Sequence, residues 1–353
     1  MMVSLSAVLP LALLPALSMA ATPVASDYPA VDKLAPANAA WSSAILKGIP
    51  NLPLNKAALP NPSWAKDVTT CPNKHQWGLT YDDGPGPYTD NLLGVLAARN
   101  VTATFFIVGS RVIQYSDVLL RTYKAGHQIA LHTWSHPAST TVSNEQYVAE
   151  IVLNARIIKE VIGVTPRFVR VPFGDIDDRV RAILVNLGLT IVAWNVDSND
   201  AGGATDVAAQ FQVRANAGSD PIISLEHDLF ATTEPQALPA LNAILAGSGK
   251  YVPMSVAQCL GYASYDEGFW DRVAGKGLPP VNPTSGSAGQ TTTTTNGGSS
   301  SSTSPSNGGA SASSAPNGGT SKQSSSSSRP LEAAKHTAAL VAMTALFAGM
   351  CMA

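Results

Sequence analysis

The sequence has little net charge and few charged residues of either sign. Charged residues make up 13% of the 353 positions, with 22 Lys and Arg against 24 Asp and Glu, so the formal net charge is -2. This balance provides no basic patch of the kind that nucleic-acid-binding domains carry, and we expect no nucleic-acid partner. The length accommodates one large α/β domain together with processed ends and a tail.

Cysteine is also scarce, with three residues in the chain. Cys351 lies in the last apolar run, which leaves Cys71 and Cys259 as an even pair. In an oxidising compartment such a pair is expected to form a disulfide, and two free thiols are the alternative. A bridge between them would close a very long loop and stabilise the fold by about 4 kcal/mol in the chain-entropy model.

The N-terminal apolar run, residues 5–17, lacks the basic residues that usually precede the apolar part of a secretion signal. The small residues Ser18 and Ala20 nevertheless suit cleavage after Ala20. We therefore expect a signal peptide over residues 1–20. A short buried helix is the alternative.

The C-terminal apolar run, residues 337–353, follows a polar spacer at 329–336 and a run of serines at 324–328. Small residues, spacer and hydrophobic end together are typical of a GPI-attachment signal. A tail-anchored membrane helix needs roughly 20 apolar residues, more than this run offers. We expect residues 329–353 to be removed, and the protein to be secreted, anchored at the outer face of the plasma membrane and transferable to the cell wall. The candidate attachment residues are Ser324, Ser325 and Ser326.

Composition divides the remaining chain into an extension, a patterned region, a flank and a stalk. Residues 21–70 are rich in Ala, Pro and Asn and form an N-terminal extension. Nearly all regular patterning lies in 71–262, and 263–283 is a short flank. Residues 284–328 consist almost entirely of Ser, Thr, Gly, Asn and Pro, so they cannot bury a core, and a disordered stalk is expected. Asn100 opens the one acceptor sequon for N-glycosylation with a permitted middle residue.

Within the patterned region, short apolar runs alternate with helical periodicity. The expected strands are 76–80, 103–108, 128–131, 168–171, 190–194, 222–225 and 250–252. The expected helices are 89–98, 112–125, 144–162, 177–187, 205–217 and 234–245. Strand–helix alternation favours an α/β fold with parallel strands, closed or nearly closed into a barrel. Seven units fall one short of the eight-fold barrel, so we expect a distorted (β/α)7-type barrel.

Polar residues gather at the carboxyl ends of the expected strands. They are Asp82 and Asp83 after the first strand, His132 and His136 after the third, Arg170 at the end of the fourth, Asp197 and Asp200 after the fifth, and His227 after the sixth. In a parallel barrel these ends share one face, which is where active sites are built.

The spacing of these residues favours a metal site. His132 and His136 are four residues apart, so on a helical turn both imidazoles can face one ion, although a structural pair is the alternative. Of the adjacent Asp82 and Asp83, one can bind the metal while the other stays available as a base; a simple turn is the alternative. Two imidazoles and one carboxylate suit Zn²⁺ with one position open, and Co²⁺ or another divalent ion fits less selectively.

Two further residues suit acid–base work and positioning. His227, opposite a metal, is a natural general acid that Asp197 or Asp200 could orient; a buried structural histidine is the alternative. Arg170 could hold a carboxylate through two parallel hydrogen bonds, or form a structural salt bridge.

Five motifs carry a resemblance to a known family. Residues 80–85 (TYDDGP), 132–136 (HTWSH), 170–173 (RVPF), 197–200 (DSND) and 225–227 (LEH) stand in the order of the five motifs of polysaccharide deacetylases, also known as carbohydrate esterase family 4 or NodB-homology enzymes. The resemblance covers about residues 71–262. The whole layout resembles that of GPI-anchored fungal chitin deacetylases.

The resemblance implies a role for each matching residue. Asp82 would be the base fixed by Arg170, His227 the acid paired with Asp200, and the zinc ligands would be Asp83, His132 and His136. The backbone N–H of Phe173 would stabilise the oxyanion, Leu225 would line the acetyl pocket, and Trp134 and Asp197 would contact substrate. Two positions depart from the family pattern: Phe173 replaces a frequent tyrosine, and Ala201 replaces a tryptophan for which Trp134 or Trp194 could compensate.

The expected activity is hydrolysis of N-acetyl groups of chitin or N-acetylglucosamine oligomers, giving chitosan and acetate, by a monomeric enzyme. Related substrates, acetylated xylan and peptidoglycan, remain open. A wall-binding protein on a degenerate enzyme scaffold is the alternative from a different class, and Ala201 is the change that favours it.

Overall fold

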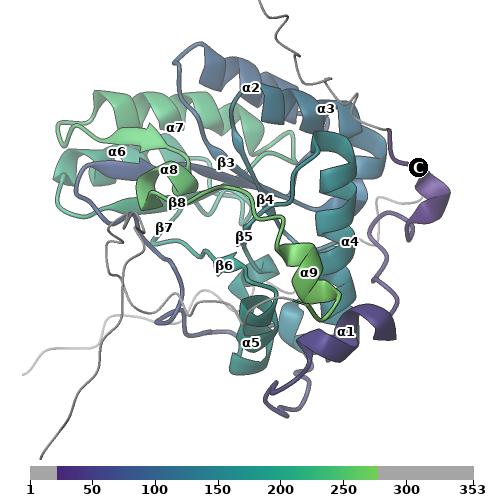
Figure 1. The fold of residues 1–353 in the computed structure, drawn as a ribbon. Coiled ribbons are helices and arrows are strands. Elements are labelled where there is room, and N and C mark those ends of the chain that lie inside the picture. The colour runs from purple at the N-terminus through teal and green to yellow at the C-terminus, as the bar shows by residue number, and fades with distance from the viewer. Residues whose placement is uncertain (1–21, 277–353) are drawn as a thin grey trace, which may run out of the picture. The chain divides into compact units, whose positions relative to one another are not determined.

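The computed structural model describes residues 22–276 (Figure 1). The expected signal peptide (1–20), the stalk (284–328), the GPI-attachment signal (329–353) and its candidate serines lie outside the described residues. The extension from residue 22 onward, the patterned region and the first part of the flank lie within them. In the described part, no helix combines the length and apolar character needed to cross a membrane.

The described residues form nine strands and nine α-helices, and strand and helix alternate through most of the domain. The strands are β1 (Gln76–Gly78), β2 (Thr80–Asp82), β3 (Thr104–Ile107), β4 (Gln128–Leu131), β5 (Phe168–Val169), β6 (Thr190–Ile191), β7 (Val196–Asp197), β8 (Ile222–His227) and β9 (Val252–Met254). The helices are α1 (Ala39–Ile45), α2 (Thr89–Ala97), α3 (Val112–Lys124), α4 (Asn144–Ile162), α5 (Asp178–Asn186), α6 (Val207–Ala217), α7 (Glu234–Ala246), α8 (Val256–Leu260) and α9 (Phe269–Val273).

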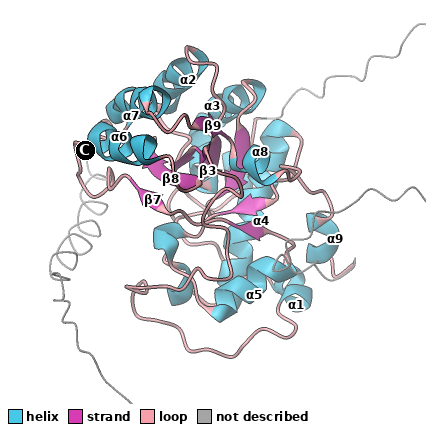
Figure 2. Cartoon of the chain, turned by 90° about the vertical axis from the view of Figure 1, so that its left-hand side faces the viewer, coloured by secondary structure: helices cyan, strands magenta, loops and turns pink. Residues whose placement is uncertain are grey.

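The strands form a parallel, distorted barrel, which confirms the expected fold class. Strands β6, β5, β4, β3, β2 and β8 are neighbours in that order, and all pairs are parallel. The segment 190–197 closes the ring. Its first part, β6, pairs with β5, and its last part, β7, pairs with β8. Helices surround the strands (Figure 2). Parallel strands covered in this way are buried on both faces, which explains the unbroken apolar runs.

The structure modifies the expected strands at two points. The first expected strand, 76–80, divides at Leu79: β1 pairs with β9 and with the start of β8, whereas β2 pairs with β3 and with the end of β8. Strand β7 was not expected, because two residues, one of them the exposed Asp197, produce no hydrophobic period.

Helix α4 carries the strongest local signals and has the expected bounds. Ser143 and Gln146 form a capping box at its start, and Gly163 ends it in the left-handed conformation with φ of 82°. Its buried face packs on the barrel. One charged residue, Glu150, is completely buried within that face.

The expected disulfide between Cys71 and Cys259 is present and spans 188 positions of sequence. Both cysteines are buried, Cys71 next to the first strand and Cys259 in α8. The bridge therefore joins the two ends of the patterned region. Asn100, the candidate glycosylation site, is exposed in the turn after α2.

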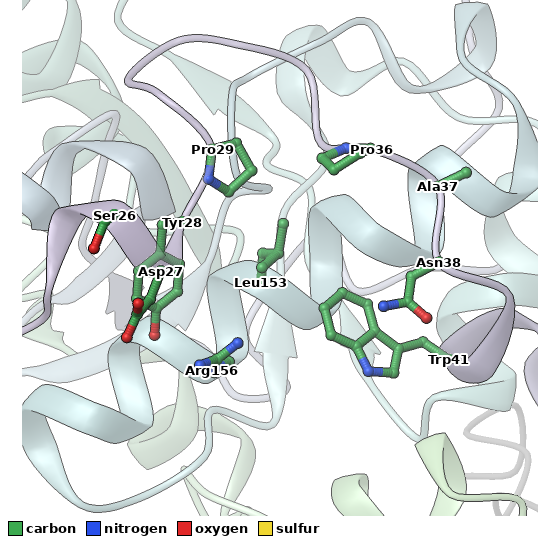
Figure 3. Close-up of a pocket in the computed structure, with 10 residues that line it drawn as sticks. All are labelled: Ser26, Asp27, Tyr28, Pro29, Pro36, Ala37, Asn38, Trp41, Leu153 and Arg156. Atoms are coloured by element: carbon green, nitrogen blue, oxygen red, sulfur yellow. The ribbon is translucent and has the colours of Figure 1, made fainter.

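The N-terminal extension contacts the domain at several separate points. Helix α1 lies against α4 and α9, and Val68 pairs in parallel with Val192 just after β6 (Figure 1). Between the extension and α4 lies a cavity of about 420 Å³, lined by Tyr28, Trp41 and Arg156 among others (Figure 3). Helices α1, α8 and α9 were not expected, because each has seven residues or fewer.

Candidate active site

Five strands bring their carboxyl ends, and the polar residues that follow them, to one face of the barrel. Asp82 ends β2 and pairs directly with His227 at the end of β8. His132 follows β4, and Arg170 follows β5. The alternation of strand and helix therefore places side chains distant in sequence around one point, as expected for a parallel barrel.

Three side chains form a candidate metal centre. One ligand atom from each of Asp83, His132 and His136 lies within 4.8 Å of the other two. Asp83 Oδ1 is 3.2 Å from His136 Nε2 and 3.5 Å from His132 Nε2. That oxygen is buried and receives no hydrogen bond. A buried, unpartnered carboxylate oxygen facing two imidazole nitrogens is well suited to a divalent cation, so the residues fit the expected metal.

The orientation of His132 is fixed by the backbone. Its Nδ1 lies 2.8 Å from the carbonyl oxygen of Arg170. Because a carbonyl only accepts, Nδ1 carries the proton and the lone pair of Nε2 faces Asp83. Hydrogen bonds of this kind set the tautomer and direction of metal-binding histidines.

Electrostatics keep the cluster in the ionisation state that a metal requires. Burial lowers the pKa of His136 to about 4, although the nearby Asp83 carboxylate opposes this effect. Burial opposes ionisation of Asp83, but the nearby imidazoles, that of His136 first, outweigh it and hold the pKa of Asp83 below its usual range. At neutral pH the site thus offers a neutral imidazole and an ionised carboxylate.

Four non-glycine residues around the site have positive φ. They are Asp83 (78°), Thr133 (65°), His136 (60°) and Phe173 (59°). Such conformations cost on the order of 1–3 kcal/mol each and persist where the surrounding structure enforces them, as at ligand-binding sites. Their gathering around one cluster independently indicates a functional site.

Arg170 holds Asp82 in a completely buried position. Its Nη1 donates to Asp82 Oδ1 at 2.7 Å and also to Thr80 Oγ1. Nε and Nη2 donate to the carbonyls of Val192 and Ala193. The expectation of two parallel hydrogen bonds to the carboxylate was therefore wrong, because backbone carbonyls occupy the other nitrogens. Asp82 Oδ2 lies 3.7 Å from His132 Nε2, on the side of the metal centre.

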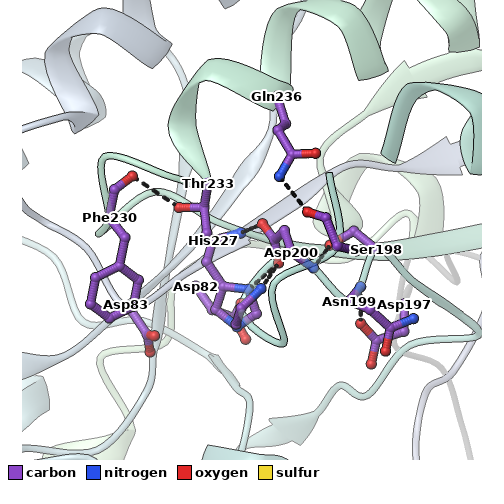
Figure 4. A network of polar contacts seen from close by, with 12 residues as sticks. Asp82, Asp83, Asp197, Ser198, Asn199, Asp200, His227, Phe230, Thr233 and Gln236 are labelled. Carbon is purple, nitrogen blue, oxygen red and sulfur yellow. Dashed lines mark hydrogen bonds and ion pairs between the residues drawn. The ribbon is translucent and has the colours of Figure 1, made fainter. Parts of the chain in front are cut away.

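Asp200 is the carboxylate partner of His227. Asp200 Oδ1 lies 2.7 Å from His227 Nδ1, and Oδ2 accepts the backbone N–H of His227 at 2.9 Å (Figure 4). Burial lowers the pKa of His227, but the hydrogen bond and charge of Asp200 outweigh it and raise the pKa to about 10. His227 is therefore protonated at neutral pH. Asp197 is exposed and instead accepts hydrogen bonds from Trp194 Nε1 and the backbone N–H of Asn199.

The residues expected to contact substrate differ in how far they are exposed. Phe173 is 52% exposed, and its ring meets His136 edge-on at 4.7 Å. Leu225 is buried in β8 beside Asp197 of β7. Trp134 is completely buried and stacks on Tyr28 with ring centroids 5.3 Å apart. The expectation that Trp134 contacts substrate or replaces the tryptophan absent at position 201 was therefore wrong.

Two buried carboxylates that support the site were missed in the sequence. Glu150 accepts hydrogen bonds from the 132–136 loop, and Asp175 accepts them from Thr140. The available signal was a charged residue on the apolar face of the helix at 144–162, and an aspartate two residues after the motif at 170–173.

A parallel α/β barrel with a His–His–Asp centre at the carboxyl ends of its strands defines the class of metal-dependent barrel proteins. Residues 69–192 match the family model of polysaccharide deacetylase. Over 215 residues the chain is 40% identical to chitin deacetylase 1 of Cryptococcus neoformans var. grubii, covering 55% of this chain and 46% of the relative. It is 36% identical to chitin deacetylase of Amylomyces rouxii, covering 59% and 52%.

The solved chitin deacetylase of the fungal pathogen Colletotrichum lindemuthianum superposes with a TM-score of 0.53 and 25% identity, covering 61% of this chain and 97% of that one. The chain therefore contains a polysaccharide deacetylase domain, which the family model matches over residues 69–192. It spans about half the length of the two sequence relatives named above.

Proposed function

We propose that this protein hydrolyses N-acetyl groups of N-acetylglucosamine units in chitin, releasing acetate and leaving chitosan. The observation that carries the proposal is the Asp83–His132–His136 cluster, flanked by Asp82 and by a protonated His227 on one face of the barrel. The chitin deacetylases among its relatives support chitin as the polymer.

We further propose Zn²⁺ as the native ion, held by Asp83, His132 and His136. Two imidazoles and one carboxylate are typical ligands of catalytic zinc, and Co²⁺ fits the same set less selectively. A bound Zn²⁺ would act as a Lewis acid and lower the pKa of a water molecule at the site. Metal analysis of the purified protein tests the identity of the ion; another dominant metal would refute zinc.

The protein's own residues move the protons. Asp82 Oδ2 accepts the proton of the water that attacks the acetyl carbonyl carbon, while Arg170 holds Oδ1. The backbone N–H of Phe173 donates to the carbonyl oxygen as that atom gains negative charge. His227 then donates its proton to the sugar nitrogen as the C–N bond breaks, and Leu225 contacts the acetyl methyl group. The products are acetate and a free amine.

The proposal is tested by acetate release from chitin oligomers, with and without chelator, by wild type and Asp82→Asn. We expect chelation to abolish release and added Zn²⁺ to restore it. Loss of a general base typically lowers the rate by 10²–10⁴-fold, and Asp82→Asn should do so while keeping its fold and bound metal. Near-normal turnover by Asp82→Asn would refute the base assignment.

The same assay separates the alternatives. Faster acetate release from acetylated xylan or peptidoglycan than from chitin oligomers would identify that polymer as the substrate. Ala201, half-buried where the family has tryptophan, is the observation that favours a binding protein without catalysis. Oligosaccharide binding without acetate release, even with added Zn²⁺, would favour that function.

We also propose that the protein acts at the cell surface, secreted and held by a GPI anchor. The support is the sequence pattern of residues 324–353, a run of serines followed by a spacer and an apolar end. Phosphatidylinositol-specific phospholipase C should release the protein from intact cells. Retention after complete digestion of a known GPI-anchored marker would contradict the anchor.

A further inference from the structure

Glu150 is a charged side chain with no solvent exposure, in the middle of α4. Its carboxylate accepts four hydrogen bonds: from Trp134 N at 2.9 Å, Ser135 N at 2.7 Å, Ser135 Oγ at 2.8 Å and Ala35 N at 2.7 Å. Every partner is a donor, so an ionised carboxylate is the matching group. A buried carboxylate is tolerated when its oxygens are satisfied in this way.

Three of the four donors come from the segment between two candidate metal ligands. Trp134 and Ser135 separate His132 from His136, and the backbone on either side of them has positive φ at Thr133 and His136. Glu150 therefore fixes the middle of a strained loop whose two ends direct the imidazoles. Only an accepting group can do this, because both backbone N–H groups point inward.

The fourth donor comes from the N-terminal extension, which lies outside the matched family region of 69–192. The extension makes a second contact with the same loop through Tyr28, whose ring stacks on Trp134 at an interplanar angle of 11°. Tyr28 is held in turn, because its hydroxyl donates to Glu160 at 2.6 Å and Arg156 lies over its ring. Next to Tyr28, the cavity of Figure 3 separates part of the extension from α4. The hydrogen bond of Ala35 and the stacked ring of Tyr28, rather than continuous packing, therefore join the extension to the loop.

The same arrangement occurs at a second loop. Asp175, buried and two residues after Phe173, accepts the backbone N–H of Leu59 from the extension at 2.8 Å. It also accepts the backbone N–H of Thr140 at 2.8 Å. In both places a buried carboxylate connects the extension to a loop at the site.

We propose that Glu150 is a positioning residue for the metal centre, and that residues 28–35 of the extension complete its support. The inference rests on the metal role proposed for His132 and His136. Without the carboxylate, the two backbone donors of the loop lose their partner and the imidazoles lose their common direction. The extension is thus part of the catalytic unit rather than a spacer that precedes it.

Glu150→Gln tests the proposal, because it keeps the shape and replaces one accepting oxygen with a donating NH₂ group. Glu145→Gln is the matched control: it is the same change on the same helix at an exposed position. The readouts are the dissociation constant for Zn²⁺, measured by chelator competition, and the visible absorption of the Co²⁺-loaded protein. Loss of a direct hydrogen-bond partner of a metal ligand typically weakens binding about 10–100-fold. Glu150 acts on the ligands through the loop backbone, so we expect Glu150→Gln to weaken Zn²⁺ binding by about 10-fold, the lower end of that range, and to alter the Co²⁺ spectrum.

A merely structural role predicts a different result. In that case Glu150→Gln would lower the melting temperature of the metal-free protein while leaving Zn²⁺ affinity and the Co²⁺ spectrum equal to those of Glu145→Gln. That result would overturn the proposal. Neither readout involves acetate release, so the test is valid whichever polymer is the substrate. If the wild-type protein binds no Zn²⁺, the proposed metal is refuted instead.

A second pair of variants covers the case in which Glu150→Gln does not fold. Tyr28→Phe keeps the ring on Trp134 and removes the hydroxyl, whereas Tyr28→Ala removes the stack. We expect Tyr28→Ala to weaken Zn²⁺ binding several-fold relative to Tyr28→Phe, both measured on folded protein. Equal Zn²⁺ affinity in the two variants would show that the extension does not support the metal loop.

Discussion

At the residue scale, His227 depends on Asp200 for its charge. Asp200 binds both the ring and the backbone N–H of His227, and it raises the pKa of the imidazole to about 10 against the opposing effect of burial. A histidine with a raised pKa is protonated, and able to act as an acid, at every pH below that value. Activity that requires this proton is lost as pH rises through the pKa.

Asp200→Asn should therefore move the alkaline limb of the pH–activity profile to lower pH. Asparagine keeps the size of the side chain and removes the charge, and an opposite charge at this distance shifts a pKa by about 1–3 units. We expect a displacement of that size in the pH dependence of kcat. Asp197→Asn is the control, because Asp197 is exposed and bonded to Trp194 and Asn199. An unmoved alkaline limb in Asp200→Asn would exclude His227 as the acid.

Residue types and spacing predicted the members of the site better than their contacts. The four-residue spacing of His132 and His136, and the position of Asp83 after a strand, predicted the cluster that the structure contains. The expected helical turn was wrong, because residues 132–136 form a loop with positive φ at Thr133 and His136. Spacing could not predict the direction of Trp134, because the positive φ of Thr133 is a property of the folded loop. Spacing also could not tell whether Asp197 or Asp200 is the partner of His227. The folded segment after β6 places Asp200 against the His227 ring and leaves Asp197 exposed.

At the scale of the elements, Asp175 connects three segments. Its carboxylate accepts hydrogen bonds from Leu59 of the extension and from both the backbone and the hydroxyl of Thr140, and it directly follows the short helix Pro172–Gly174 that carries Phe173. Removal of one accepting oxygen leaves buried N–H groups without a partner. Each such group destabilises the fold by about 1–3 kcal/mol.

Asp175→Asn should lower the free energy of unfolding in urea by about 1–3 kcal/mol. The control is Asp178→Asn, three residues further on, where an exposed carboxylate pairs with Lys66 and Arg181. Exposed pairs typically contribute about 0–1 kcal/mol. If both variants unfold at the same urea concentration, the connection through Asp175 does not stabilise the fold.

Helices and strands with many buried residues were predictable from sequence, and short ones were not. The helix at 144–162 has its expected bounds because a capping box and an apolar face specify the same ends. Strands β5, β6 and β7 have two residues each, so their pairing depends on neighbours in space rather than on a local period. The division of the first strand at Leu79 likewise reflects pairing with two different partners.

At the scale of the whole molecule, the extension and the disulfide both join distant parts of the chain. Composition rich in Ala, Pro and Asn contains no periodic signal, so the contacts of residues 28–35 and of Leu59 could not be predicted. The pairing of Cys71 with Cys259 could be, because these two remain once Cys351 is assigned to the last apolar run. The number of cysteines thus predicted one long-range contact, whereas hydrophobic periodicity could not predict the contacts of the extension.

Replacement of both cysteines by alanine should destabilise the protein without removing the site. Loss of a native disulfide typically lowers the free energy of unfolding by about 2–5 kcal/mol, and here the bridge spans 188 positions. For a chain of this size each kcal/mol corresponds to about 2–4 °C, so calorimetry should give a melting temperature lower by roughly 5–20 °C. The cysteines lie in a cluster with Phe106, whose ring centroid is 6.5 Å from that of His132, so they reach this metal ligand through another side chain. We expect Zn²⁺ affinity at low temperature to stay within a few-fold of wild type. An unchanged melting temperature would show that the bridge adds nothing to the packing around it, whereas a large loss of Zn²⁺ affinity in the folded variant would show that the bridge also shapes the site.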